Sequence, residues 1–280
     1  MKGKVICTDL DGTLFFPKKR VFMMTKKNRR FLQKFVDNGG RLAIVSGRNR
    51  YFAEKLQKNL KRRVDVLGCN SSFIEVDGKT IREVSMDNQK LFNFIQDMKK
   101  DFPVTGFLLM SKNHNLVAVK KDFWWFHNIG YHIYFWSEGV YREPFIQNDD
   151  VFLKEVTTGQ VFKLMLFFGV TKKAKQKAML ANKELRKRYP DFEFSWCGEL
   201  IEVTAKGCSK AEGIKIYLDY LKINSDNVMV VGDSGNDISM FQAFENSFCM
   251  EHAPLTISKY ANNVIRSVDE LALYLENKGE

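Results

Sequence analysis

Two aspartates stand at the end of the first apolar run of this sequence. Asp9 and Asp11 follow residues 5–7, a run without polar alternation that is typical of a strand covered on both faces. Residues two apart on an extended chain point the same way, so both carboxylates can face one small site. Gly12 then allows the backbone to leave the strand sharply. This strand end therefore has the residues for chemistry that needs two carboxylates.

Further small polar residues follow other predicted strands or begin a predicted helix: Ser46, Lys210, Asp233 and Asp237. Because the carboxyl ends of parallel strands share one edge of a sheet, we expect these side chains to meet Asp9 and Asp11 there. Carboxylates so close together repel one another unless a cation lies among them, and hard oxygen ligands suit Mg²⁺. Ser46 and Lys210 offer donors to the oxygens of a phosphate. The set predicts phosphoryl-transfer chemistry with a magnesium ion.

Each of these residues has a simpler interpretation when taken singly. An aspartate at a strand end or before glycine is ordinarily a turn residue or a helix N-cap. Lys210 alone would be a solvated lysine in the first turn of a helix, and Ser46 alone a cap. Cys208, near Lys210, has no histidine or second cysteine to support a reactive thiol. Only the joint occurrence of the residues in this order favours the catalytic interpretation.

Alternating strands and helices are expected to position these side chains. The pattern predicts strands over 41–45 and 64–67, and Thr25 caps the helix that precedes the first of them. Ser209 and Glu212 predict a capping box at the start of a further helix, which is followed by a buried strand over 228–231. The sequence therefore predicts an α/β protein with a doubly wound, Rossmann-like parallel sheet.

The regular alternation of strands and helices is interrupted between residues 82 and 204. A helix is expected over 87–100, an antiparallel pair over 106–110 and 116–120, a strand over 161–168, a helix over 171–189, and strands over 192–196 and 200–204. This pattern predicts an inserted α+β domain. Residues 1–81 and 205–280 then form one domain, and residues 82–204 form the insertion.

The insertion contains a dense aromatic stretch over residues 123–136. Such rings can stack on a sugar or a nucleobase, but more often they form the core of a small domain. His127 and His132 lack the third ligand that a metal site requires.

The net charge of +11 and the pI near 9.3 favour an anionic partner. The basic residues occur in short clusters that we interpret as solvated loops and helix faces, because no nucleic-acid-binding motif accompanies them. We therefore expect a small phosphorylated metabolite as the partner, and neither nucleic acid nor a membrane.

The five cysteines form no C-x-x-C pair and are typical of reduced thiols in the cytosol. The N-terminus reaches Asp9 after too few apolar residues for a signal peptide, and the sequence has no uncharged apolar run of about 18 residues. We expect a cytoplasmic protein.

Four motifs occur in order along the chain: Asp9-Leu10-Asp11-Gly12-Thr13-Leu14, Ser46-Gly47-Arg48, Gly207-Cys208-Ser209-Lys210, and Gly232-Asp233-Ser234-Gly235-Asn236-Asp237. With the size of the insertion, they resemble the haloacid dehalogenase superfamily, and within it the Cof-type phosphatases with a large α+β cap of the C2B type. The resemblance covers essentially the whole chain. It implies a hydrolase of phosphate monoesters.

The resemblance also assigns roles to the four aspartates. Asp9 would attack phosphorus to form an aspartyl-phosphate, and Asp11 would be the general acid and then the general base. Asp233 would bind Mg²⁺ beside Asp9 and the main-chain carbonyl of Asp11, and Asp237 would orient the ion.

By the same resemblance, Ser46 and Lys210 would hold the phosphoryl group, with amides near Gly47 and Thr13. Lesser candidates for substrate contact are Arg48, Asn236 and Asn70. The sequence departs from the family pattern at Asn70-Ser71-Ser72, where Asn-Gly-Ala is common, and at Arg266-Ser267-Val268-Asp269, where an asparagine-rich loop is common. These departures concern the substrate and leave the phosphoryl chemistry intact.

The leading hypothesis is a Mg²⁺-dependent phosphatase for a small metabolite, most plausibly a sugar phosphate, with the cap closing over the site. A phosphomutase of similar architecture is a close alternative. A non-enzymatic sensor of a phosphorylated ligand is a third hypothesis, and the nucleophile at Asp9 argues against it because binding alone needs none.

Overall fold

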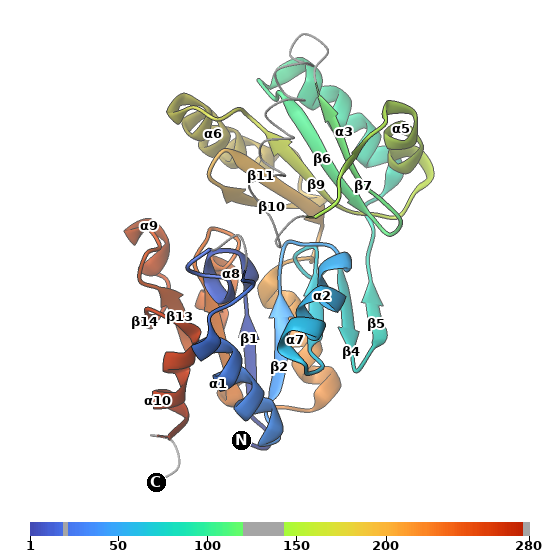
Figure 1. Ribbon diagram of the computed structural model, residues 1–280. Coiled ribbons are helices and arrows are strands. Elements are labelled where there is room, and N and C mark those ends of the chain that lie inside the picture. The colour runs from blue at the N-terminus through green and yellow to red at the C-terminus, as the bar shows by residue number, and fades with distance from the viewer. Residues whose placement is uncertain (19–21, 120–142, 277–280) are drawn as a thin grey trace. The chain divides into compact units, whose positions relative to one another are not determined.

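The computed structural model describes residues 1–18, 22–119 and 143–276 (Figure 1). The chain forms two compact units, the first made of Met1–Arg82 and Ser209–Glu280 and the second of Glu83–Cys208. The joins expected from the sequence were 81/82 and 204/205. The predicted aromatic stretch 123–136 lies outside the described residues.

The first unit is built on an eight-stranded sheet in the order β14-β13-β12-β1-β2-β3-β4-β5. The strands are β1 (Val5–Thr8), β2 (Arg41–Val45), β3 (Asp65–Gly68), β4 (Phe73–Val76), β5 (Lys79–Glu83), β12 (Val228–Gly232), β13 (Ser247–Met250) and β14 (Asn263–Ile265). The pairs from β14 to β3 are parallel, and β4 returns antiparallel to β3. The order reverses between β1 and β12, so this is the point where a ligand is expected. The predicted doubly wound α/β fold is confirmed.

Helices cover both faces of this sheet. The first unit contains α1 (Lys26–Asp37), α2 (Tyr51–Leu60), α7 (Lys210–Leu221), α8 (Ile238–Ala243), α9 (Leu255–Ser258) and α10 (Leu271–Glu276). One buried cluster joins Val5 and Cys7 of β1 to α7, α8 and α9. Alternation along the strand sends Ile6 to the opposite face, where α1 and α2 pack (Figure 1). The sheet is therefore buried on both sides, as its unbroken apolar strands predict.

Side-chain caps fix where several helices begin. Thr25 accepts a hydrogen bond from the Asn28 amide at the start of α1, and Ser209 accepts one from the Glu212 amide at the start of α7. Both caps were predicted. The Glu212 carboxylate instead lies 2.7 Å from the Lys215 ammonium. The cap at Ser209 places Lys210 in the first turn of α7.

The second unit has a six-stranded sheet in the order β10-β11-β9-β6-β7-β8. Its strands are β6 (Gly106–Ser111), β7 (Asn115–Val119), β8 (Ile146–Gln147), β9 (Val161–Phe167), β10 (Phe192–Cys197) and β11 (Leu200–Ala205), and its helices are α3 (Asn88–Asp101), α5 (Asp149–Thr158) and α6 (Lys172–Arg188). The three helices pack in one core against alternate residues of these strands. The predicted antiparallel pair appears as β6 and β7.

Sequence analysis did not predict α5. Its signals are an Asn148 cap, which accepts from the Val151 amide, and the buried pair Phe152 and Val156, four residues apart. Leu153 between them is exposed, so the apolar pattern does not mark one face clearly. Within the described residues, no helix is long and apolar enough to cross a membrane.

The turn after β3 brings α7 unusually close. Cys69, Asn70 and Ser71 take positive φ angles of 49°, 54° and 72° in succession. A Cβ built on Gly213 of α7 would lie 1.9 Å from Ser71 Oγ. That hydroxyl is buried and has no hydrogen-bond partner among the described residues. Gly213 and the small Ser71 therefore let the helix carrying Lys210 pack directly on this turn.

This contact predicts a coupled pair of substitutions. Gly213→Ala should destabilise the protein by about 1–3 kcal/mol through overpacking, even though alanine favours a helix. Adding Ser71→Gly should restore most of the loss, because glycine makes room and suits the positive φ. Urea denaturation of both single variants and the double variant measures the coupling. Additive effects would contradict the proposed contact.

Candidate active site

A buried lysine joins two aspartates at the reversal point of the sheet. Lys210 Nζ donates to Asp9 Oδ1 at 2.7 Å and to Asp237 Oδ1 at 2.6 Å. Asp9 follows β1, Asp237 follows β12, and Lys210 begins α7. The three side chains are between 0 and 7 % exposed. The structure thus brings together residues that lie up to 228 positions apart in the sequence, as was expected from the order of the strands.

Asp237 is held by the loop that contains it. Its Oδ2 accepts hydrogen bonds from the amides of Asp233 and Ser234, both at 2.9 Å. A Cβ on Gly232 would lie 2.3 Å from Asp237 Cγ, so only glycine fits beside this carboxylate. Both oxygens of Asp237 are therefore engaged, one with Lys210 and one with backbone amides. This arrangement makes Asp237 an anchor for Lys210 and for the loop.

Asp233 approaches the turn Leu10–Leu14 after β1. Its Oδ1 accepts a hydrogen bond from Thr13 Oγ1 at 2.9 Å. A Cβ built on Gly12 would lie 2.2 Å from Asp233 Oδ2. Gly12 is thus needed for close approach as well as for its positive φ of 78°. An amide near Thr13 was predicted to help hold the phosphoryl group; in the structure the Thr13 hydroxyl contacts Asp233.

Burial and like charge shift the acidity of these groups. Burial, followed by the charge of Asp237, raises the pKa of Asp233 to about 7. Burial also raises the pKa of Asp9 well above its usual range, against the lowering effect of Lys210. Burial lowers the pKa of Lys210, but the carboxylates of Asp237 and Asp9 outweigh it and raise that pKa above the usual value. Lys210 is therefore a permanent cation in the site.

Three of the four predicted metal-ligand candidates lie together. Asp9, Asp233 and Asp237 each offer a carboxylate oxygen, and these oxygens lie within 4.8 Å of one another. Lys210 supplies one positive charge against three carboxylates, so the described groups leave an excess of negative charge. An all-oxygen donor set with this excess fits Mg²⁺. Among the described residues, Asp237 already accepts hydrogen bonds from Lys210 and from two backbone amides, more than Asp9 or Asp233 accepts, so Asp9 and Asp233 are the carboxylates better placed to hold the ion.

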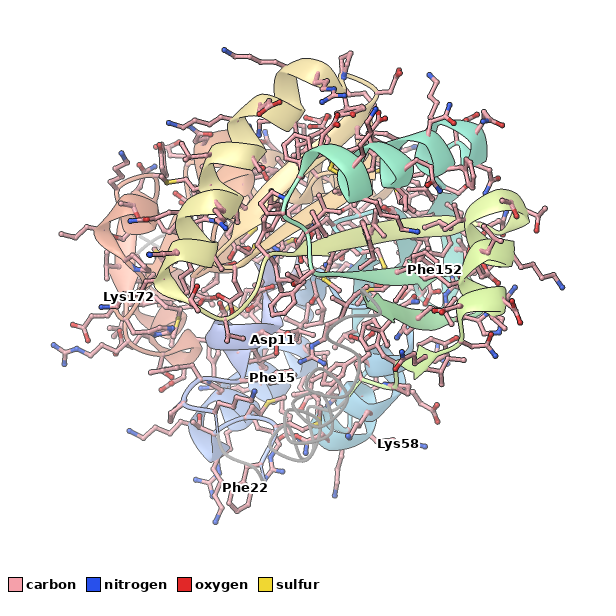
Figure 2. The ribbon with its side chains drawn as sticks, turned by 90° about the horizontal axis from the view of Figure 1, so that it is seen from above. Asp11, Phe15, Phe22, Lys58, Phe152 and Lys172 are labelled. Carbon is pink, nitrogen blue, oxygen red and sulfur yellow. The ribbon has the colours of Figure 1, made fainter. Side chains whose placement is uncertain are left out.

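The carboxylate of Asp11 is not part of this cluster. Arg48 donates two charged hydrogen bonds to the Asp11 carboxylate, from Nε to Oδ2 and from Nη2 to Oδ1, both at 2.6 Å. The Arg48 guanidinium lies 4.7 Å from the centroid of the Phe52 ring. Asp11, labelled in Figure 2 on the segment after β1, is half exposed. Arg48, predicted as a substrate contact, thus pairs in this structure with the predicted acid–base residue.

Hydrogen bonds connect the motif Ser46-Gly47-Arg48 to the turn after β3. Ser46 is buried, and its Oγ accepts from the Arg48 amide across Gly47 at 3.2 Å. The Asn70 amide donates to the Ser46 carbonyl at 3.0 Å. Asn236 Nδ2 in turn donates to Asn70 Oδ1 at 3.4 Å. These contacts bring Ser46, Gly47 and Asn236 to the same sheet edge as Asp9; of the three, Ser46 was expected at this edge from the order of the strands.

Removing Lys210 tests the charge balance of the site. Lys210→Met should cost about 3–5 kcal/mol of unfolding free energy, because it leaves buried carboxylates without their cation. Lys215→Met is the matched control on the same helix: its side chain is half exposed and, among the described residues, forms an ion pair with Glu212 alone, so the loss should be about 0–1 kcal/mol. Chemical denaturation at pH 8 in EDTA compares the two. Equal losses would show that the buried contacts do not stabilise the fold.

The raised pKa of Asp233 predicts a pH dependence of stability. The unfolded chain has an aspartate pKa of about 3.9, whereas the folded value is about 7, so the folded state binds the proton more tightly. The resulting stabilisation is complete below the unfolded pKa and is lost as pH rises through the folded value. In EDTA, melting temperature should therefore fall between pH 4 and pH 7.5 more steeply in the wild type than in Asp233→Asn. Parallel curves would contradict this assignment.

Comparisons with known proteins agree with this geometry. The sequence model of the haloacid dehalogenase-like hydrolase family matches residues 6–275 of this chain. A Bacillus subtilis protein named "Putative phosphatase YkrA" is 25% identical over 276 residues, which cover 96% of this chain and 95% of the relative. A Streptococcus mutans structure, SMU.1108c, has a TM-score of 0.77 at 19% identity and covers 99% of both chains. A structure titled as a HAD subclass IIB sugar phosphatase has a TM-score of 0.75 at 19% identity, covering 98% of this chain and 99% of its own. At these identities the two structures establish a shared fold.

Proposed function

Because this chain belongs to the haloacid dehalogenase-like hydrolases and is a phosphatase, we propose that it hydrolyses the phosphate monoester of a small metabolite, a sugar phosphate, with Mg²⁺. Asp9 is the proposed nucleophile. The observation that carries the proposal is the buried contact of Asp9 with Lys210, beside Asp233, at the reversal point of the sheet. A sensor that only binds phosphate has no use for a buried carboxylate in this place.

The first proposed step forms a covalent intermediate on Asp9. Lys210 fixes Oδ1 and so leaves Oδ2 to attack phosphorus. The bond from Oδ2 to phosphorus forms while the bond from phosphorus to the alcohol oxygen breaks, and Asp11 gives that oxygen a proton. In the second step, Asp11 takes a proton from water as the water oxygen attacks phosphorus, and the bond from Asp9 Oδ2 to phosphorus breaks. Inorganic phosphate leaves, and Asp9 returns to a carboxylate.

The neighbouring residues hold the phosphoryl group and the ion. Ser46 has its hydroxyl proton available, because its oxygen is the acceptor from the Arg48 amide. Asp9, Asp233 and the main-chain carbonyl of Asp11 would hold Mg²⁺. The bound ion would offset the negative charge of the substrate phosphate that the Asp9 carboxylate approaches. Lys210 contributes a second, permanent positive charge.

Arg48 has to change partner in this scheme. Its two charged hydrogen bonds occupy both carboxylate oxygens of Asp11, whereas the first step needs Asp11 to face the alcohol oxygen of the substrate. An anionic substrate competes with Asp11 for the guanidinium. Arg48 then contacts the substrate, and Asp11 is released for acid–base work.

Two observations support a sugar phosphate and an inserted cap. The structurally similar protein titled as a sugar phosphatase shares this fold across nearly its whole length. The chain carries a net charge of +11, which attracts small anions. We propose that the second unit supplies recognition of the sugar portion, because the described phosphate-site residues all belong to the first unit.

A panel of phosphorylated metabolites tests this function. With Mg²⁺, the wild type should release phosphate from at least one sugar phosphate, and Asp9→Asn should lower the rate by on the order of a thousandfold or more. Asp226→Asn changes an exposed aspartate outside the site and should leave the rate unchanged. Isomerised sugar phosphate without free phosphate would instead identify a phosphomutase. No turnover of any substrate, or full activity in Asp9→Asn, would refute the mechanism.

A further inference from the structure

We infer that His252 is a positioning residue for the metal site: its imidazole, stacked on Phe16, orients the carboxylate of Asp233 toward the ion. The inference rests on the proposed function, since it concerns the Mg²⁺ that we propose there. His252 lies outside the four motifs, and the sequence analysis did not single it out.

The backbone around His252 is fixed at the same sheet edge as the site. His252 follows β13, which pairs in parallel with β12, the strand that leads to Asp233. On one side of His252, the Glu251 amide donates to the Ile265 carbonyl at 2.8 Å; on the other, the Ala253 amide donates to the Met250 carbonyl at 3.0 Å. Ala253 itself packs in the core of the first unit. The ring therefore starts from a well-defined backbone position.

An aromatic contact fixes the orientation of the imidazole. The rings of His252 and Phe16 are stacked, with centroids 3.9 Å apart and planes inclined by 17°. Phe16 lies just after the turn Leu10–Leu14, the turn that supplies Gly12 and Thr13 to Asp233. The loops after β1, β12 and β13 thus meet at one carboxylate.

The two oxygens of Asp233 face different partners. Thr13 Oγ1 donates to Oδ1 at 2.9 Å. His252 Nε2 lies 3.7 Å from Oδ2, which is longer than a direct hydrogen bond. A donor at Oδ1 and an imidazole beside Oδ2 restrict the rotation of the carboxylate and so prepare it for the ion. Loss of such an outer partner typically weakens metal binding by about 10- to 100-fold.

A purely structural role predicts a different result. The His252 side chain is 33% exposed, and substitutions at such positions usually change folding stability little. Its removal should therefore affect the ion more than the fold. Metal affinity and metal-free stability separate the two roles.

The experiment is Mg²⁺ titration by calorimetry, without substrate, of the wild type and of His252→Leu, His252→Gln and Phe16→Leu. His252→Leu keeps apolar contact with Phe16 but has no N–H donor, so its Kd should rise by roughly tenfold. His252→Gln keeps a donor and should recover part of the affinity. Phe16→Leu should cause a smaller loss because the imidazole remains. All four proteins should melt at similar temperatures in EDTA.

Several results would overturn the inference. A Kd for His252→Leu within about twofold of the wild-type value would refute it while leaving the proposed cofactor in place. A lowered melting temperature in EDTA with equal losses of affinity in the Leu and Gln variants would indicate a structural role. Electron spin echo spectra of bound Mn²⁺ with a directly coordinated imidazole nitrogen would make His252 a ligand. If the wild type takes up no Mg²⁺ or Mn²⁺, the proposed cofactor fails and this inference fails with it.

Discussion

The first unit depends on balancing buried charge where β1, β12 and α7 meet. One ammonium group, that of Lys210, lies between the carboxylates of Asp9 and Asp237 and is almost completely removed from water. Charged groups at such depth are tolerable only when they are paired and hydrogen-bonded. Backbone amides complete the environment of Asp237, whereas Asp233 adds a negative charge that the described side chains do not balance. The site is therefore stable as a scaffold, and its excess of negative charge favours a cation.

Small residues make this concentration of charge sterically possible. Gly12 lets the turn after β1 touch Asp233, Gly232 makes room for Asp237, and Gly213 lets α7 rest on the turn at Ser71. At each of these positions a single added carbon would lie closer to its neighbour than atoms normally approach. The motifs are thus packing requirements as much as they are sets of reactive groups, because the backbones must approach before the side chains can meet.

Much of the fold and the grouping of the proposed site residues at one sheet edge could be predicted from local signals. The unbroken apolar strands, the caps at Thr25 and Ser209, and polar residues after successive strands predicted a parallel sheet with its site at one edge. Contacts between distant segments could not be predicted in this way. The grip of Arg48 on Asp11 and the stacking of His252 on Phe16 depend on loop conformations that have no periodic signal. Helix α5 was missed because an exposed leucine blurs its apolar face. The catalytic roles and the recognition of substrate by the second unit stay predictions.

The second join between the units lies directly beside the catalytic machinery. The second unit ends at Cys208, whose side chain belongs to its core and whose carbonyl accepts a hydrogen bond from Thr204 Oγ1 at 2.8 Å. The next residue, Ser209, caps α7, and Lys210 follows. A single residue, Ser209, therefore separates the inserted unit from Lys210, which donates a hydrogen bond to Asp9. The insertion can therefore be exchanged more freely at Arg82 than at its other end: a chimaera with a different insert has to keep the segment Thr204–Ser209, or it disturbs the cap that places Lys210 beside Asp9.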